Sequence, residues 1–89
     1  LADTLTASNI PVYFTVDLDC LDPSAFPGTG TPEAGGVTFI QLLSAIQTVC
    51  RCNIVGADIN ELAPMLDASG VSTATACKVL REFLLALSK

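Results

Sequence analysis

The sequence predicts an α/β protein in which two parallel strands alternate with two helices. Two β-branched and apolar segments, residues 11–16 and 54–59, are separated by a long connection that includes one helical stretch, and a second helical stretch follows. A strand, a crossover through a helix and another strand imply parallel pairing, because a short hairpin cannot join parallel strands. Since parallel sheets need helices on both faces, the order β-α-β-α predicts a portion of a three-layer αβα fold.

The size and composition indicate that this portion belongs to something larger. The chain has 89 residues, of which 51% are hydrophobic and 15% charged. An isolated globule this small would have too few polar residues to coat its surface, and two strands alone do not make a stable sheet. We therefore expect the chain to be a segment of a longer protein, as its start at Leu1 without an initiator methionine also suggests.

The first strand is predicted at residues 11–16, PVYFTV. Its β-branched and aromatic residues favour a strand, and the apolar run hardly alternates, which is typical of a strand buried on both faces. Three aspartates follow it directly, Asp17, Asp19 and Asp22. Residues 20–36 are then rich in proline and glycine, and a long irregular connection of this kind in a compact domain is usually functional.

The first helix is predicted to begin after Thr38, which forms a capping box with Gln41, and to end near Arg51. Its apolar side chains share one face of a helix; they are Phe39, Leu42, Leu43, Ile46 and Cys50. Residues 54–59 predict the second strand, interrupted by Gly56, which lets a neighbouring group pack close.

The second helix is predicted to run from about Ser72 nearly to the end of the chain. Its apolar residues again recur at helical spacing, and we expect this stripe to face the core. The stripe consists of Thr73, Ala76, Cys77, Leu80, Phe83, Leu84 and Leu87.

Charge and cysteine content narrow the classes of function. Nine acidic and four basic residues give a net charge of −5, and the four cations form no basic patch, so no nucleic-acid partner is expected. The negative balance favours a cationic small molecule or a metal ion. No stretch is long and apolar enough to span a membrane. The four cysteines read as reduced core thiols of a cytoplasmic protein, with a disulfide or metal role as the alternative.

Acidic residues follow both predicted strands. In open parallel sheets, ligands bind beyond the carboxyl ends of the strands, where Asp17 and Asp19 follow the first strand and Asp58 and Glu61 end the second. If the strands are neighbours, at least three carboxylates converge, which is costly without a compensating cation. Oxygen ligands of this kind favour Mg²⁺, Mn²⁺ or Ca²⁺.

The Asp17-x-Asp19 spacing fits such a site, because strand residues two apart point the same way. Both carboxylates can then reach one ion, or one can bridge two ions while the other completes a shell. The same spacing also occurs in phosphatases of the haloacid dehalogenase type, in glycosyltransferases and in plain turns. A phosphatase with Asp17 as nucleophile and Asp19 as acid needs Thr or Val two residues after Asp19, where this chain has Leu21.

The longer pattern resembles the signature of the ureohydrolase family, the arginases and agmatinases. That signature, Ser/Thr-x-Asp-x-Asp-x-x-Asp-Pro followed by Gly-Thr-Pro and Gly-Gly, is matched by Thr15, Asp17, Asp19, Asp22, Pro23, Gly30, Thr31, Pro32, Gly35 and Gly36. The stretches PGTGTPEAGG and DINELAPMLDASGVSTATACKVLREFL are more similar to agmatinases than to arginases. The resemblance implies an arginase-like fold, in which residues 1–89 are the carboxyl-terminal segment of a single, incomplete ureohydrolase catalytic domain.

By this resemblance, Asp17 bridges two manganese ions and Asp19 ligates one of them. Glu61 receives the guanidinium group of the substrate, and Thr31 lines the same pocket. The expected reaction converts agmatine to putrescine and urea, a step of polyamine biosynthesis, with related substrates such as guanidinobutyrate left open. Family members are commonly trimers or hexamers, so a homo-oligomer is expected. Asp22 is expected to be structural, with its side chain capping the turn before Pro23.

The chain contains no histidine. The family supplies histidine metal ligands and a proton-shuttling histidine from upstream of the matched segment, so no catalytic residue is assigned here. We expect the isolated chain to be inactive without the remainder of the enzyme fold. The alternative is a non-catalytic, truncated module used for packing or oligomerisation.

Overall fold

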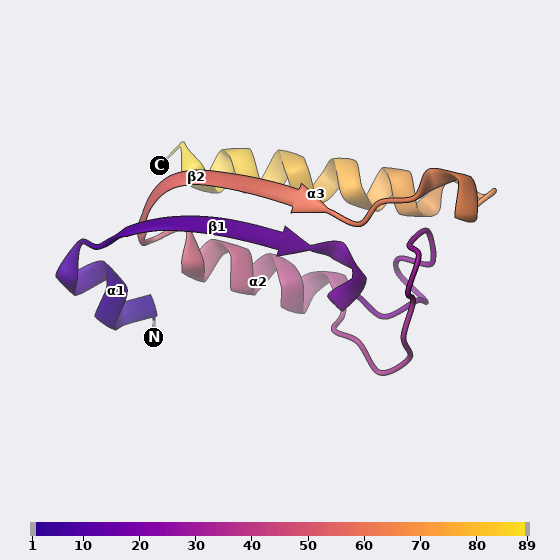
Figure 1. Ribbon diagram of the computed structural model, residues 1–89, viewed down its shortest axis with the longest axis horizontal. Helices are drawn as coiled ribbons and strands as arrows, with labels where there is room; N and C mark the ends of the chain where they lie inside the picture. Colours follow the sequence, from indigo (N-terminus) through magenta and orange to yellow (C-terminus); the bar gives the residue numbers. More distant parts are fainter. Residues whose placement is uncertain (1, 89) are drawn as a thin grey trace.

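The computed structural model describes residues 2–88, in which two parallel strands are accompanied by helices (Figure 1). In chain order the elements are helix α1 (Ala2–Ser8), strand β1 (Pro11–Asp17), helix α2 (Phe39–Val49), strand β2 (Asn53–Asn60) and helix α3 (Val71–Leu87). Short 3₁₀ turns lie at Leu18–Cys20 and Pro64–Leu66. The predicted α/β arrangement with parallel pairing is confirmed. Among residues 2–88, no helix has the length and apolar character needed to cross a bilayer.

Helix α1 was not expected from the sequence, so the described order is α-β-α-β-α. Three of its seven residues, Thr4, Thr6 and Ser8, have modest helix propensity, which is why the segment gives little helical signal. The helix ends at Ser8 and is followed by Asn9, which adopts a left-handed backbone conformation with φ of 54°. Asparagine is one of the few residues that tolerate this conformation after a helix.

The strands pair in register from Pro11 opposite Asn53 to Asp17 opposite Asn60, with one irregularity between Val12 and Tyr13. Gly56 lies under the Tyr13 ring, where a Cβ atom would come within 2.8 Å of the ring atom Cδ2. The prediction that Gly56 permits a close approach is therefore confirmed. The register also brings the carboxyl ends of both strands to the same edge of the sheet.

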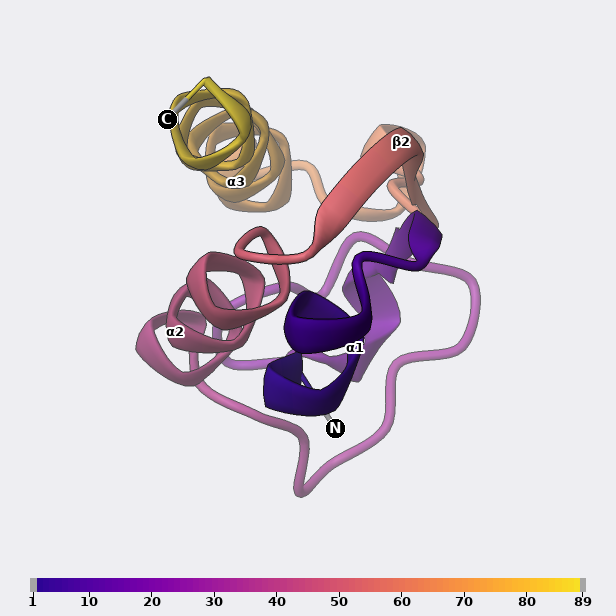
Figure 2. The ribbon, with the colours of Figure 1, turned by 90° about the vertical axis from the view of Figure 1, so that its left-hand side faces the viewer.

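Helices α2 and α3 lie on the same side of the sheet (Figure 2). Val16 on that side is buried, whereas Tyr13 and Val55 are 61% and 64% exposed. The expectation that the first strand is buried on both faces is therefore wrong for the described residues. The reason is that no helix within residues 2–88 covers the second face, so the apolar run has only one packed side.

Helix α2 follows its sequence signals. The Thr38 hydroxyl accepts a hydrogen bond from the Gln41 backbone N–H at 3.1 Å, and the Gln41 side chain accepts one from the Thr38 N–H at 2.9 Å. Leu42 and Ile46 are buried, as expected of the predicted stripe. The capping box and the core-facing side of this helix are both confirmed.

Helix α3 packs through only part of the predicted stripe, because Ala76 and Phe83 are buried as expected while the rest of the stripe is not. Its buried residues are Ser72, Ala76, Val79 and Phe83, whereas Leu80 and Leu84 of the predicted stripe are 49% and 57% exposed. The helix has two apolar flanks, and only one of them packs against α2 and the loop after β1. The other flank, including Cys77, Leu80, Leu84 and Leu87, lines an open apolar groove beside β2.

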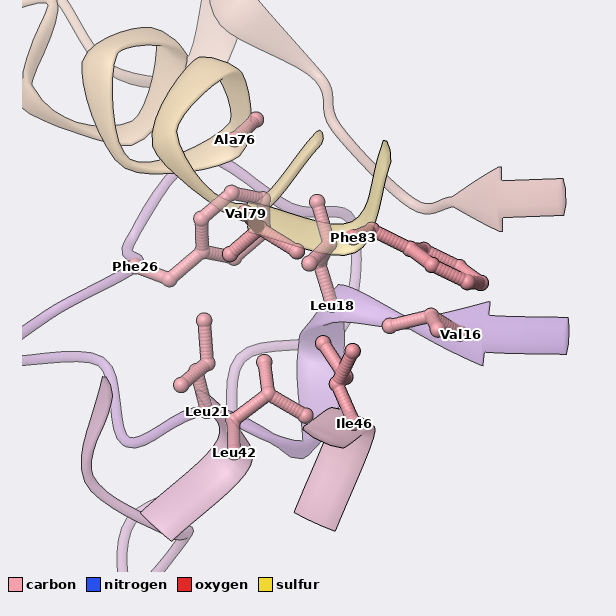
Figure 3. Packing of buried hydrophobic residues seen from close by; sticks show 9 residues of the cluster. All are labelled: Val16, Leu18, Leu21, Phe26, Leu42, Ile46, Ala76, Val79 and Phe83. Carbon is pink, nitrogen blue, oxygen red and sulfur yellow. The ribbon is translucent and has the colours of Figure 1, made fainter. Parts of the chain in front are cut away.

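The core joins the sheet to both helices and to the proline- and glycine-rich loop (Figure 3). Its members are Val16, Leu18, Leu21, Phe26, Leu42, Ile46, Ala76, Val79 and Phe83. The loop contributes Leu21 and Phe26, both essentially fully buried, and Phe14 of β1 stacks at a tilt on Phe83 with 5.2 Å between ring centroids. Burying Phe26 contributes about 1.5–3 kcal/mol, so the loop is anchored at its middle.

Candidate metal centre

Three carboxylates lie together at the carboxyl ends of the two strands. Asp17 is the last residue of β1, Asp19 lies in the 3₁₀ turn that follows, and Glu61 comes directly after β2. One carboxylate oxygen from each residue lies within 4.8 Å of the other two. The convergence expected from parallel pairing is therefore present for these three residues.

A turn, and not strand alternation, brings Asp19 beside Asp17. The strand ends at Asp17, whose carboxylate caps the turn by accepting a hydrogen bond from the Asp19 backbone N–H at 3.2 Å. The expectation that both side chains project from one strand face is wrong, because Asp19 has left the extended backbone. Aspartate favours capping turns of this kind, so the Asp-x-Asp spacing itself contributes to building the turn.

The backbone of Glu61 adopts a left-handed conformation with φ of 80°. Among residues 2–88, Asn9 is the only other non-glycine residue with a positive φ. Asparagine tolerates this region, whereas a long side chain such as glutamate adopts it at a cost of about 1–3 kcal/mol. The surrounding structure must therefore hold Glu61 in a conformation that its own residue type does not favour.

The cluster is electrostatically unbalanced. Partial desolvation, followed by the neighbouring Asp19 carboxylate, raises the pKa of Asp17 above its ordinary value. Burial and the two aspartates likewise raise the pKa of the adjacent Cys20 thiol. The ion pairs that the structure shows within residues 2–88 do not involve these carboxylates; they join Asp3 to Arg51, and Glu82 to Lys78 and Arg81.

The donor set fits a hard divalent cation. One oxygen from each of the three carboxylates lies within 4.8 Å of the other two, which is close enough for them to share one cation. Carboxylate oxygens without nitrogen or sulfur ligands suit Mg²⁺, Mn²⁺ or Ca²⁺. Such a charge would offset the repulsion among the carboxylates and favour their ionised forms.

Thr31 also lies at this end of the sheet. Its hydroxyl donates a hydrogen bond to Asp19 Oδ2 at 3.1 Å. The loop that carries Thr31 is closed by a bridge between Leu21 and Val37. Gly36 is required there, because a Cβ atom would lie 2.6 Å from the Cys20 carbonyl oxygen. The structure therefore gathers all four predicted site residues, Asp17, Asp19, Thr31 and Glu61, at one edge.

Asp22 is a structural residue, as the sequence predicted. Its Oδ2 atom accepts hydrogen bonds from the Ser24 backbone N–H at 3.0 Å and from the Ser24 hydroxyl at 2.5 Å. Its Oδ1 atom accepts one from the Gly35 N–H at 3.1 Å. These donors, with Ser24 first, hold the pKa of Asp22 below its ordinary value. The capped turn includes Pro23 and does not precede it.

Asp58 was expected among the converging acids, but it does not belong to the cluster formed by Asp17, Asp19 and Glu61. Its carboxylate instead accepts hydrogen bonds from the side chains of Tyr13 and Thr15 on β1 and of Asn60 on β2. These hydrogen bonds favour the ionised carboxylate and hold the pKa of Asp58 below its ordinary value. Thr15 has the largest effect, followed by Tyr13, and Asn60 contributes as well.

Asp67 and Ser72 form a second acidic feature that the sequence did not reveal. Asp67 Oδ2 accepts hydrogen bonds from the Ser72 backbone N–H at 2.8 Å and from its hydroxyl at 2.6 Å. The buried Ser72 hydroxyl in turn accepts one from the Gly28 N–H at 2.7 Å. This arrangement, called the Asp67 node below, ties the first turn of α3 to the loop. The only sequence signal for it was the turn-forming stretch DASG.

A family model described as the arginase family matches residues 1–86. The agmatinase of Bacillus subtilis strain 168 is 47% identical over 81 residues, which cover 89% of this chain and 28% of the relative.

Solved structures agree with this match. A protein of Clostridium difficile described as an agmatinase superposes with a TM-score of 0.86 at 46% identity, over 98% of this chain and 33% of that one. Proclavaminate amidino hydrolase from Streptomyces clavuligerus superposes with a TM-score of 0.85 at 34% identity, over 97% and 30% of the two chains. The chain thus spans about a third or less of the length of these relatives.

Proposed function

We propose, starting from the fact that this chain belongs to the arginase family, that residues 1–89 form the carboxyl-terminal segment of a ureohydrolase catalytic domain. The proposed reaction is hydrolysis of agmatine to putrescine and urea, a step of polyamine biosynthesis. The convergence of Asp17, Asp19 and Glu61 carries this proposal, because it supplies a cation site and a carboxylate for a guanidinium group at one edge. The names of the agmatinases to which the chain is similar favour agmatine over other guanidino compounds.

Asp17 and Asp19 would hold a pair of manganese ions. Their oxygens fit this role because they lie close together and have no cationic partner among the described ion pairs. When bound, the metal pair supplies Lewis-acid activation of water at neutral pH. Thr31 supports Asp19 through its hydroxyl, which leaves the second Asp19 oxygen available.

Glu61 would receive the cationic end of the substrate. A carboxylate and a guanidinium group form paired, charge-assisted hydrogen bonds that fix orientation as well as position. The left-handed backbone of Glu61 places its carboxylate beside Asp17 and Asp19. A guanidinium held there has its central carbon next to the metal ligands, which is the positioning that hydrolysis requires.

The chain would depend on the rest of the enzyme fold. It contains no histidine, so the histidine metal ligands and the proton-shuttling histidine that the family resemblance implies must come from the rest of the enzyme. The isolated segment would therefore be inactive. We place the complete protein in the cytoplasm and expect it to be a homo-oligomer.

A non-catalytic packing module is the second candidate. The exposed apolar residues on the open sheet face and in the groove beside β2 favour it, because they offer surface for another protein segment. Tyr13, Val55 and Leu84 are the clearest examples. In this alternative the acidic cluster would serve no reaction.

Urea release distinguishes the two candidates. The coding sequence is extended upstream to the natural start codon, and the resulting full-length protein, called the parent protein below, is supplied with manganese. Agmatine, arginine and guanidinobutyrate are then tested in parallel. We expect urea from agmatine above all, and its loss in Asp17→Ala. Urea from none of the three substrates would contradict the hydrolase proposal, and a natural start codon near Leu1 would favour the packing module.

A further inference from the structure

A hydrogen-bond network crosses the two strands beside the acidic cluster. Asp58 Oδ2 accepts a hydrogen bond from the Tyr13 hydroxyl at 2.8 Å. Asp58 Oδ1 accepts one from the Thr15 hydroxyl at 2.5 Å and one from the Asn60 side-chain amide at 2.6 Å. The Asn60 amide also donates to Thr15 Oγ1 at 3.0 Å. One carboxylate thereby connects two side chains of β1 to one of β2.

The network adjoins the candidate metal centre along both strands. Thr15 faces Asp58 in the strand register, and the next pair on the same sheet face is Asp17 opposite Asn60. Asn60 is also the residue immediately before Glu61. Each strand therefore has a network residue within two positions of its site carboxylate.

Asp58 itself is not available as a further cation ligand. Both of its oxygens already accept hydrogen bonds, and it is absent from the cluster of converging carboxylates. Its carboxylate is ionised at neutral pH, as is usual for aspartate, and the charge strengthens each of the bonds it accepts. The Asp58 carboxylate therefore binds side chains of the two strands and is not free to bind a ligand.

Glu61 needs an external constraint that this network can supply. Its left-handed backbone is unfavourable for glutamate, so the chain on either side must hold it. On its amino-terminal side, the Asn60 side chain is bound to Asp58 and Thr15 at once. Two hydrogen bonds therefore hold the residue from which the Glu61 backbone continues.

We propose that Asp58 is a positioning residue, which acts through Asn60 on Glu61 and through Thr15 on Asp17 to hold the two site carboxylates together. The purpose of this placement rests on the proposed function. The placement itself does not, because it follows from the hydrogen bonds and the strand register. A residue that only stabilised the sheet would affect folding without affecting the relative position of Asp17 and Glu61.

Three variants of the parent protein separate these roles. Asp58→Ala removes both acceptors. Asp58→Asn keeps an oxygen for Thr15 and Asn60, and its amide can donate to the Tyr13 hydroxyl oxygen, so it is the conservative rescue. Asp67→Ala is the matched control, because it removes another carboxylate with several hydrogen bonds but lies outside the acidic cluster.

For Asp58→Ala we expect manganese affinity and kcat/KM for agmatine to fall by about 10-fold to 100-fold, the usual cost of losing a residue that orients a metal site. Asp58→Asn should restore most of both quantities. Asp67→Ala should lower the thermal midpoint while leaving both largely unchanged. Equal losses of kcat/KM in Asp58→Ala and Asp67→Ala, or no rescue by Asp58→Asn, would overturn the proposal.

Crystal structures of the parent protein and of Asp58→Ala, both without metal, provide a readout that needs no activity. We expect Glu61 to leave the left-handed region in the variant and its carboxylate to move away from Asp17. A Glu61 that keeps its positive φ and its place beside Asp17 would overturn the proposal. If the unaltered parent protein releases no urea, the proposed function fails, while this comparison still decides the role of Asp58.

Discussion

The Asp67 node and the cluster of Asp17, Asp19 and Glu61 are both acidic, yet their carboxylates have opposite surroundings. Asp67 accepts hydrogen bonds from the backbone and hydroxyl groups of Ser69 and Ser72, and these donors hold its pKa well below the ordinary value. Asp17 accepts one backbone hydrogen bond and faces another carboxylate, and its pKa is raised. The Asp67 oxygens are thus occupied by donors of the fold, whereas the Asp17 carboxylate lies beside a second carboxylate and lacks a compensating charge among the described ion pairs.

The two regions also differ in what they contribute to the fold. The Asp67 node joins α3 to the loop through Ser72 and Gly28, and the Ala63 N–H donates to the Gly28 carbonyl oxygen at 2.7 Å. The acidic cluster contributes repulsion and a strained Glu61 backbone. A site that destabilises the protein in the absence of its ligand is the expected cost of function.

The largest effect is expected at Gly28. In Gly28→Ala the new Cβ would lie 2.7 Å from the Cβ atom of Ser72, a fully buried residue. We expect the free energy of unfolding of the parent protein to fall by about 1–3 kcal/mol, the range for overpacking. Chemical denaturation measures this. Gly30→Ala is the control, since a Cβ there meets nothing within 4 Å; a similar loss in both variants would show that the Asp67 node is not a tight contact.

The acid sensitivity of the Asp67 node should be the next largest effect. The pKa of Asp67 in the folded protein is below its ordinary value of 3.8, so its stabilising contribution is present above about pH 4 and is lost as the pH falls through the folded pKa. Asp67→Asn should therefore be less stable than the parent protein at pH 7, with the difference shrinking below pH 4. Thermal midpoints across this range test the prediction, and a difference that stays constant would contradict it.

The smallest effect is expected at Asp17 without metal. Asp17→Asn keeps the oxygen that caps the turn and removes one charge from the cluster. In metal-free parent protein we expect a thermal midpoint that is unchanged or raised by about 2 °C, a shift that corresponds to a fraction of a kcal/mol to about 1 kcal/mol. Added manganese should then stabilise the unaltered protein but not the variant. A fall as large as that of Asp67→Asn would mean that Asp17 is structural.

Much of the fold and the content of the site could be predicted because local signals and topology agreed. The Thr38–Gln41 capping box sets the start of α2, and two apolar strands joined through a helix require parallel pairing. Parallel pairing then brings the residues after both strands to one edge, which is why Asp17, Asp19 and Glu61 could be placed together.

The remaining features depend on tertiary contacts that have no local signature. The packed side of α3 is set by α2 and Phe26, so helical spacing alone could not choose between its two apolar flanks. The hydrogen bonds of Asp58 to Thr15 and Tyr13 arise from the strand register, and the left-handed backbone of Glu61 follows directly after the last strand pair. Helix α1 is short and rich in Thr and Ser, so propensity gave little indication of it.

Manganese binding to two aspartate variants tests the central distinction most directly. Asp17→Ala and Asp22→Ala each remove one carboxylate of the signature. Asp17 belongs to the acidic cluster, whereas both oxygens of Asp22 accept hydrogen bonds from Ser24 and Gly35. The bound manganese of the purified parent protein and of both variants is measured after equilibrium dialysis. We predict about two ions per parent subunit, as in two-metal hydrolases, a loss of this binding in Asp17→Ala, and retention with lower stability in Asp22→Ala. Equal manganese loss in both variants would contradict the account.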